Sequence, residues 1–213
     1  MMMIDDSRSM GEAGPLALRA LSTISSALTR LDLADSLSIA SFAQDMRILH
    51  PFGSILTEEK EISILSQFSF SASQTMLANS LKNVVPIFET AKSSLIGGAG
   101  GGEGGLVLQI CFVISDARID SDNRGHLERI IRGMAEKHIL VVLVIIDRNA
   151  DAKDSIFNTK TVSFKGDKVS TAAYLDDFPF PYYVAIQQVQ ALPQVLSDAL
   201  KQWFELIRGQ TDS

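Results

Sequence analysis

Residues 106–115 read LVLQICFVIS and residues 139–146 read ILVVLVII, and these two nearly unbroken apolar runs decide the fold class. Runs of this kind predict strands that are buried on both faces of a parallel sheet. Shorter apolar runs predict four further strands, at residues 1–4, 37–42, 46–52 and 182–186. The strand at 46–52 is expected at an edge of the sheet, because Pro51 cannot donate a ladder hydrogen bond.

Helical patterns separate these strands. Apolar residues recur at helical spacing in five segments, at residues 15–31, 57–68, 75–92, 122–137 and 193–208. Pro86 lies inside the third segment and is expected to kink or shorten that helix. Strands that alternate with helices predict an α/β fold with a doubly wound, mostly parallel, Rossmann-like sheet and helices on both faces. In such a sheet the ligand site lies beyond the carboxyl ends of the strands.

Two segments interrupt the alternation. Residues 96–105, IGGAGGGEGG, contain no lysine and follow a helix, so we expect a flexible surface loop and not a phosphate-binding loop. Residues 158–180 carry strand-like stretches on either side of Lys165-Gly166-Asp167, which predicts a β-hairpin inserted before the last strand. We therefore expect one domain over residues 1–213 that includes this insertion.

The composition is typical of an α/β domain, with 46% hydrophobic and 21% charged residues. The formal net charge of −6 argues against nucleic acid as a direct partner. The single cysteine, Cys111, excludes an internal disulfide and a cysteine-based metal site. We expect Cys111 to be a buried thiol in a protein of a reducing compartment. No apolar run reaches the roughly 18 to 20 residues that span a bilayer, so no membrane association is expected.

The beginning of the chain, MMMIDD at residues 1–6, is short for a central strand. Such a strand normally needs about five or six residues, and the polar residues begin at Asp5. We interpret the chain as a piece of a longer polypeptide, cut just upstream of its first strand. A natural start with a short strand is the alternative. No charged segment precedes an apolar one, so no signal peptide is expected.

Polar side chains follow two of the predicted strands. Asp5-x-Ser7-x-Ser9 comes after the first strand, Asp116 follows the strand of residues 106–115, and Thr75 ends a loop before a helix. Together they offer three hydroxyls and two carboxylates, an oxygen-only set that selects Mg²⁺ or Mn²⁺ over Zn²⁺. Taken alone, the first motif is equally well explained as a helix cap.

Other polar residues near these loops have different expected roles. Ser71 and Ser73 compete with Thr75 as the hydroxyl of the second loop. Asp6 is expected to cap or support the turn and not to bind an ion. The three histidines are scattered and pair into no ligand set or catalytic triad: His50, His126 and His138.

This residue set resembles the metal-ion-dependent adhesion site (MIDAS) of von Willebrand factor A domains. In that family, Asp-x-Ser-x-Ser, a Thr from a second loop and an Asp from a third loop hold a divalent ion. The resemblance covers nearly the whole chain, because the order of the motifs and their strand–helix context match. It implies that the ion, Mg²⁺ or Mn²⁺, is held by Asp5, Ser7, Ser9, Thr75 and Asp116. It also implies that a Glu or Asp of a partner protein supplies the last ligand.

Three stretches give a narrower resemblance: DDSRSM (5–10), ISDARI (114–119) and FPFPYYVAIQQVQALPQVLSDALKQWFE (178–205). They are similar to the carboxy-terminal adhesion-type domain of the giant dynein-like AAA+ ATPases of large-ribosomal-subunit assembly. That family implies a nuclear protein whose domain grips ubiquitin-like domains of pre-60S assembly factors. ATP would bind only to the ATPase ring, elsewhere in the polypeptide, which would pull to release those factors and could also dock this domain.

Arg8 and Arg118 flank the predicted metal loops. An arginine at such a place commonly lies on a simple solvated rim, and contact with an acidic partner surface is the alternative. Two other functions remain open beside a non-enzymatic binding module. One is an adhesion domain for extracellular ligands, like integrin inserted domains. The other is a phosphoryl-transfer enzyme with Asp5 as its nucleophile, although such enzymes commonly carry a second acid where this chain has Ser7.

Overall fold

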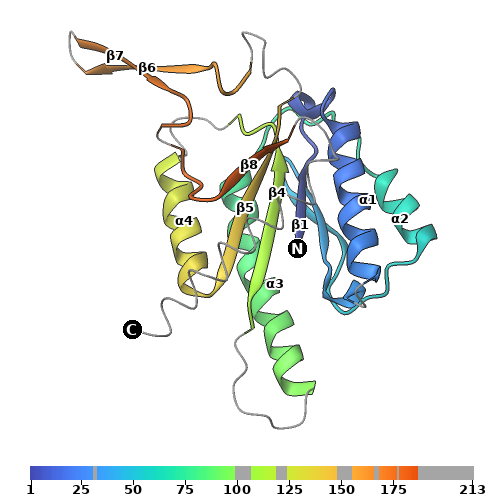
Figure 1. Cartoon of the computed structure of the whole chain (residues 1–213). Helices are drawn as coiled ribbons and strands as arrows, with labels where there is room; N and C mark the ends of the chain where they lie inside the picture. Colours follow the sequence, from blue (N-terminus) through green and yellow to red (C-terminus); the bar gives the residue numbers. More distant parts are fainter. Residues whose placement is uncertain are drawn as a thin grey trace.

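The computed structural model describes residues 1–30, 33–98, 107–118, 124–147, 155–165, 168–176 and 178–186. Its centre is a six-stranded sheet in the order β3-β2-β1-β4-β5-β8 (Figure 1). The strands of this sheet are β1 (Met2–Asp5), β2 (Ile39–Phe42), β3 (Met46–His50), β4 (Gln109–Ser115), β5 (Ile139–Ile146) and β8 (Tyr183–Ile186). All six lie within or beside the apolar runs that predicted them, and their boundaries differ by a few residues.

The sheet is parallel except at one edge. β1 pairs in parallel with β2 on one side and with β4 on the other, and β4-β5-β8 continue the parallel set. β3 is antiparallel to β2 and forms an edge, as Pro51 indicated. Every residue of β5 is buried, because neighbouring strands flank it and helices cover the sheet. The predicted doubly wound, mostly parallel α/β fold is confirmed.

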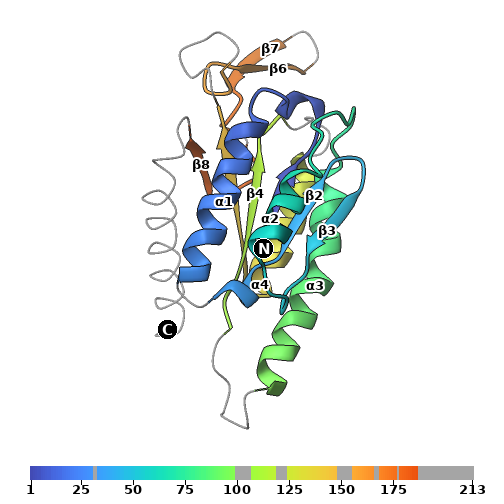
Figure 2. The same cartoon turned by 90° about the vertical axis from the view of Figure 1, so that its right-hand side faces the viewer.

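Within the described residues, four α-helices lie against the two faces of the sheet, as Figure 2 illustrates. They are α1 (Gly14–Arg30), α2 (Glu58–Leu65), α3 (Leu77–Gly98) and α4 (Arg124–Glu136). Buried residues of α1 and α2 share one core with Met2 and Ile4 of β1. Buried residues of α3 and α4 share a second core with Met3, which points to the opposite face because side chains alternate along a strand. Asp5 follows this alternation and therefore lies on the side of α3 and α4.

Between β5 and β8 the chain forms a separate antiparallel pair, β6 (Lys160–Lys165) and β7 (Lys168–Ala173). Figure 1 shows this pair projecting away from the main sheet, at the end where β1 and β4 finish. The two strands lie within the segment 158–180, where a β-hairpin was predicted. They bring the residues that follow β7 close to the carboxyl end of β4.

Pro86 does not shorten its helix, so that part of the prediction was wrong, and a kink at Pro86 stays a prediction. α3 runs through Pro86 and continues to Gly98. Pro86 has no N–H, so the carbonyl of Lys82, four residues earlier, receives no helical hydrogen bond. Both residues are exposed. Water can reach this exposed side of the helix, so the lost hydrogen bond need not end it.

Two other boundaries differ from the sequence predictions. α2 ends at Leu65, with Ser66 as its C-cap, and not at residue 68. Residues 96–98 belong to α3, and the rest of the glycine-rich stretch lies outside the described residues. The helix predicted at 193–208 also lies outside them. Among the described helices, none combines the length and the hydropathy that crossing a membrane requires.

Candidate metal centre

The end of β1 holds a buried carboxylate. Asp5 is 1% exposed, and its Oδ1 accepts a hydrogen bond of 2.9 Å from the backbone N of Ser7. Its Oδ2 accepts a bond of 2.8 Å from Oγ of Ser115, the last residue of β4. The hydroxyls of Ser7 and Ser9 lie 3.0 Å apart. Two strand ends therefore gather one carboxylate and three hydroxyls in a small volume.

The second loop lies against this turn through its backbone. The N of Arg8 donates to the carbonyl of Ala72 over 2.8 Å, and Ser7 and Ala72 form a parallel bridge. The N of Met76 donates to the carbonyl of Ala43 over 2.7 Å, just beyond the strand β2 that pairs with Asp5. Thr75 directly precedes Met76, so it lies at the same edge of the sheet as the first loop.

Asp6 holds the second loop in place. Its Oδ1 accepts hydrogen bonds from the backbone N of Ser69 and of Phe70, at 2.9 and 2.5 Å. Its Oδ2 lies 3.7 Å from a guanidinium nitrogen of Arg47. Asp6 is therefore a supporting residue of the second loop, in agreement with the role that the sequence indicated.

The third loop carries Asp116, one residue past the end of β4. Its side chain is 13% exposed, and its Oδ1 accepts a hydrogen bond of 3.2 Å from the backbone N of Arg118. Its Oδ2 lies 3.6 Å from Nε of Arg118. Because β4 pairs directly with β1, Asp116 follows the strand end beside Asp5, and the two carboxylates interact through their charges.

Asp5 is a buried carboxylate with a second acid, Asp116, near it. Burial raises the pKa of Asp5, the hydrogen bonds from Ser7 and Ser115 oppose that rise, and the charge of Asp116 adds to it. No Lys, Arg or His in the described part of the chain forms an ion pair with Asp5. Nor do the described residues gather three His, Cys, Asp or Glu side chains, the usual set for Zn²⁺. Two carboxylates among hydroxyls fit a hard divalent cation.

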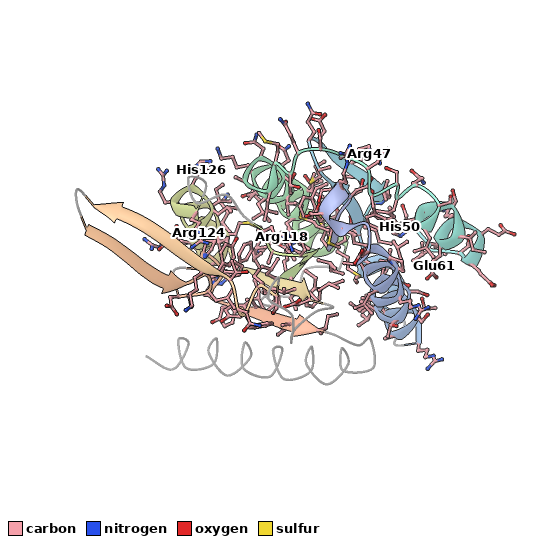
Figure 3. All side chains as sticks on the ribbon, turned by 90° about the horizontal axis from the view of Figure 1, so that it is seen from above. Arg47, His50, Glu61, Arg118, Arg124 and His126 are labelled. Carbon is pink, nitrogen blue, oxygen red and sulfur yellow. The ribbon has the colours of Figure 1, made fainter. Side chains whose placement is uncertain are left out.

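Arginines lie around this end of the sheet. Arg118 is 66% exposed in its side chain and Arg8 is exposed as well. Arg47 contributes a third guanidinium group at the end of β2 and β3, where Asp6 binds it. Figure 3, seen from above this end, shows Arg118 near the centre and Arg47 toward one side.

The structure thus brings Asp5, Ser7, Ser9 and Asp116 together and places Thr75 at the same edge. Sequence analysis missed two contributors. One is Ser115, whose position directly before Asp116 was a usable signal. The other is Tyr174, whose hydroxyl donates to the carbonyl of Ala117 over 3.0 Å. No local sequence pattern marks that contact, because the partners are 57 positions apart.

Comparison with curated proteins finds midasin from two organisms. The chain is 30% identical over 211 residues to midasin of Dictyostelium discoideum, which covers 98% of this chain and 3% of that protein. It is 28% identical over 218 residues to midasin of Giardia intestinalis, covering 97% of this chain and 4% of that protein. The chain therefore spans only a few per cent of the length of these relatives. No protein-family model matches it.

Solved structures show the same fold at low identity. The SpRpn10 VWA domain superimposes with a TM-score of 0.52 at 13% identity, covering 95% of this chain and 93% of that one. Proximal thread matrix protein 1 of the mussel byssus gives 0.51 at 14% identity, covering 92% of this chain and 44% of that one. The chain therefore has the fold of a von Willebrand factor A domain, and its sequence is similar to midasin over nearly its whole length.

Proposed function

We propose that this domain is a metal-dependent protein-binding module. In it, Mg²⁺ or Mn²⁺ is held by the five residues that the sequence singled out: Asp5, Ser7, Ser9, Thr75 and Asp116. The observation that supports this most is the buried carboxylate of Asp5, which accepts hydrogen bonds from Ser7 N and Ser115 Oγ and lacks an ion pair within the described residues. A buried anion without a countercharge is costly, and a bound cation would reduce that cost.

A cation held mainly by neutral hydroxyls stays electron-poor and would attract a carboxylate from another protein. Asp5 and Asp116 would hold it by charge, and Ser7, Ser9 and Thr75 would supply hydroxyl oxygens. Exposed Arg8 and Arg118 lie beside these loops and would contact acidic groups around the partner's carboxylate. The partner surface that fits is therefore an exposed Glu or Asp with further acids near it.

The proposed partners are ubiquitin-like domains of pre-60S ribosome assembly factors, which would present that Glu or Asp. The support is the similarity to midasin over nearly the whole chain, together with the motif resemblance to AAA+ ATPases of ribosome assembly. In a longer protein, an ATPase ring would bind ATP and pull on the captured factor, and this domain itself would be no enzyme. The proposed location is the nucleus, and imaging of the tagged full-length protein tests it.

Metal binding is tested by calorimetric titration of the domain with MnCl₂ and MgCl₂, and by thermal unfolding with each ion or with EDTA. We expect saturable binding and a higher melting temperature with the ion, since a ligand that binds only the folded state stabilises it. Asp5→Asn keeps the shape of the side chain and removes its charge. It should abolish binding without lowering the melting temperature in EDTA, because burial of the charged form is unfavourable. Asp45→Asn, which changes an exposed acid at the same end of the sheet, is the matched control.

Partner capture is tested with a purified ubiquitin-like domain of an assembly factor, in Mg²⁺ and in EDTA. We expect binding in Mg²⁺ that EDTA abolishes and that is lost when the partner's metal-facing acid is replaced by Ala. Equal affinity in both buffers would refute the module. Turnover of p-nitrophenyl phosphate that disappears in Asp5→Asn would instead favour the phosphoryl-transfer enzyme. Capture of an extracellular matrix protein in place of the ubiquitin-like domain would favour the adhesion domain.

A further inference from the structure

We propose that Tyr174, which follows β7, is a positioning residue for the carboxylate of Asp116. This inference rests on the proposed metal site and adds a residue from outside its three loops. The contact that supports it is the hydrogen bond of 3.0 Å from the Tyr174 hydroxyl to the carbonyl oxygen of Ala117. Its partners come from two segments that meet only in the folded protein.

A single peptide group connects Tyr174 to Asp116. The carbonyl of Ala117 and the N–H of Arg118 belong to the same planar peptide unit. Its oxygen accepts the hydrogen bond from Tyr174, and its N–H donates to Oδ1 of Asp116 over 3.2 Å. A rotation of this peptide unit would break both hydrogen bonds. By fixing the carbonyl of Ala117, the hydroxyl of Tyr174 therefore also fixes the N–H of Arg118, which orients the carboxylate of Asp116. Bonds in series through one peptide group also strengthen one another.

The turn needs such support because its backbone is strained. Ala117 has a φ of 59°, in the left-handed region that L residues other than Asn, Asp and Gly seldom adopt. The residue is 1% exposed, and its N donates to Oγ of Ser115 over 3.2 Å. Strained conformations persist where surrounding contacts determine them. Here Ser115 binds the peptide unit before Ala117 and Tyr174 binds the one after it.

Tyr174 is itself held firmly enough to act in this way. The guanidinium carbon of Arg124, at the start of α4, lies 4.3 Å from the centre of its ring. Its backbone N donates to the carbonyl of Thr159 over 2.9 Å, and its ring packs on Phe178 with centroids 6.0 Å apart. Contacts with α4, with the segment before β6 and with the segment before β8 therefore fix the position of the hydroxyl.

The decisive variant is Tyr174→Phe, which removes the hydroxyl and keeps the ring. We expect its affinity for Mn²⁺, titrated alone by calorimetry at 20 °C, to fall by roughly two- to tenfold, the effect of one hydrogen bond. We also expect faster amide hydrogen exchange at Arg118 in EDTA, where no ion contributes. Tyr183→Phe is the matched control, because Tyr183 packs on Phe178 in the same aromatic group. It should leave both values unchanged.

The two readouts separate this inference from the proposed function. If Tyr174→Phe lowers only the melting temperature and changes neither Mn²⁺ affinity nor exchange at Arg118, the tyrosine is structural and the inference is overturned. If the wild-type domain binds no divalent ion, the proposed metal site fails. The rate of amide hydrogen exchange at Arg118 in Tyr174→Phe then still decides whether Tyr174 positions the turn. An unchanged rate refutes that role.

Discussion

The hydroxyl of Ser115 joins two loops by a hydrogen bond of 2.8 Å to Oδ2 of Asp5, across the parallel pair of β4 and β1. The same oxygen accepts a bond from the backbone N of Ala117. Ser115 thus fixes both the first carboxylate and the turn that carries Asp116. It supports the candidate site without being one of the five predicted ligands.

Ser115→Ala should weaken Mn²⁺ binding by on the order of tenfold, as expected for a group that orients metal ligands. Titration calorimetry measures the effect, and urea unfolding measures stability. Ser38→Ala is the control. The buried hydroxyl of Ser38 donates to the carbonyl of His50 over 2.8 Å, at the amino end of β2 and so at the end of the sheet opposite the candidate site. Both variants should lose about 1 kcal/mol of stability, and only Ser115→Ala should lose metal affinity. Equal affinities in the two variants would contradict this role.

Thr75→Ala and Ser73→Ala decide between two of the three candidate hydroxyls of the second loop. Thr75 is half-buried, whereas Ser73 is exposed. The neighbour of Thr75, Met76, donates its backbone N–H to the carbonyl of Ala43, directly after β2. We expect Thr75→Ala to lower Mn²⁺ affinity by about tenfold or more and Ser73→Ala to leave it unchanged, both by calorimetry. The reverse result would assign the site to Ser73 and show that Thr75 was the wrong choice.

Gly14→Ala should destabilise the domain through Phe70. A Cβ atom at Gly14 would lie 2.4 Å from a ring carbon of Phe70, whose own backbone N is bound by Asp6. The ring cannot move without disturbing the second loop, so we expect a loss of about 1 to 3 kcal/mol in urea unfolding. Gly133→Ala on α4 is the matched control, since no atom lies within 4 Å of its Cβ. It should gain up to about 1 kcal/mol from helix propensity.

The buried imidazole of His50 should make stability depend on pH. Burial lowers the pKa of His50, the backbone of Ser54 opposes this change, and the charge of Lys60 adds to it. Between the lowered folded pKa and the unfolded value of about 6.5, the unfolded chain binds more protons. Stability should therefore fall as the pH decreases below about 6.5. Urea unfolding from pH 7.5 to 5 should show this loss in wild type and in His126→Gln, and less of it in His50→Gln.

Cys111 should react only when the domain unfolds. Its thiol is fully buried, and burial raises the pKa of Cys111 to about 12. At pH 8 the reactive thiolate is scarce and inaccessible. We expect negligible reaction with Ellman's reagent in buffer and complete reaction in 8 M urea, followed by absorbance. Rapid labelling of the native domain would show that β4 opens far more easily than its burial implies.

Much of the fold could be predicted from local sequence, because a buried strand is a run of consecutive apolar residues. The run at 139–146 became β5 with every residue buried, and Pro51 correctly indicated that β3 is an edge. Pro86 shows the limit of this reasoning. A proline leaves one helical carbonyl without its hydrogen bond, and the helix can continue where water reaches that carbonyl. Local sequence does not show which side of α3 faces water, because that depends on the packing of the helix.

The residue types at the candidate site were likewise evident from the sequence. Asp-x-Ser-x-Ser and Asp116 follow apolar runs, and the carboxyl ends of parallel strands meet at one edge of a sheet. The supporting contacts were not evident. Ser115 and Asp5 are 110 positions apart, and Asp6 and Phe70 are 64 apart. Only strand register and loop packing bring such pairs together.

The sequence by itself determined the kind of fold, the order of its strands along the chain and the oxygen-rich turns that end two of them. These properties depend on apolar periodicity and on residues adjacent in the chain. Tertiary structure alone decided that Ser115 bonds Asp5 and that Tyr174 binds the turn after Asp116. A hydrogen bond needs atoms within about 3 Å, and the folded sheet sets that proximity.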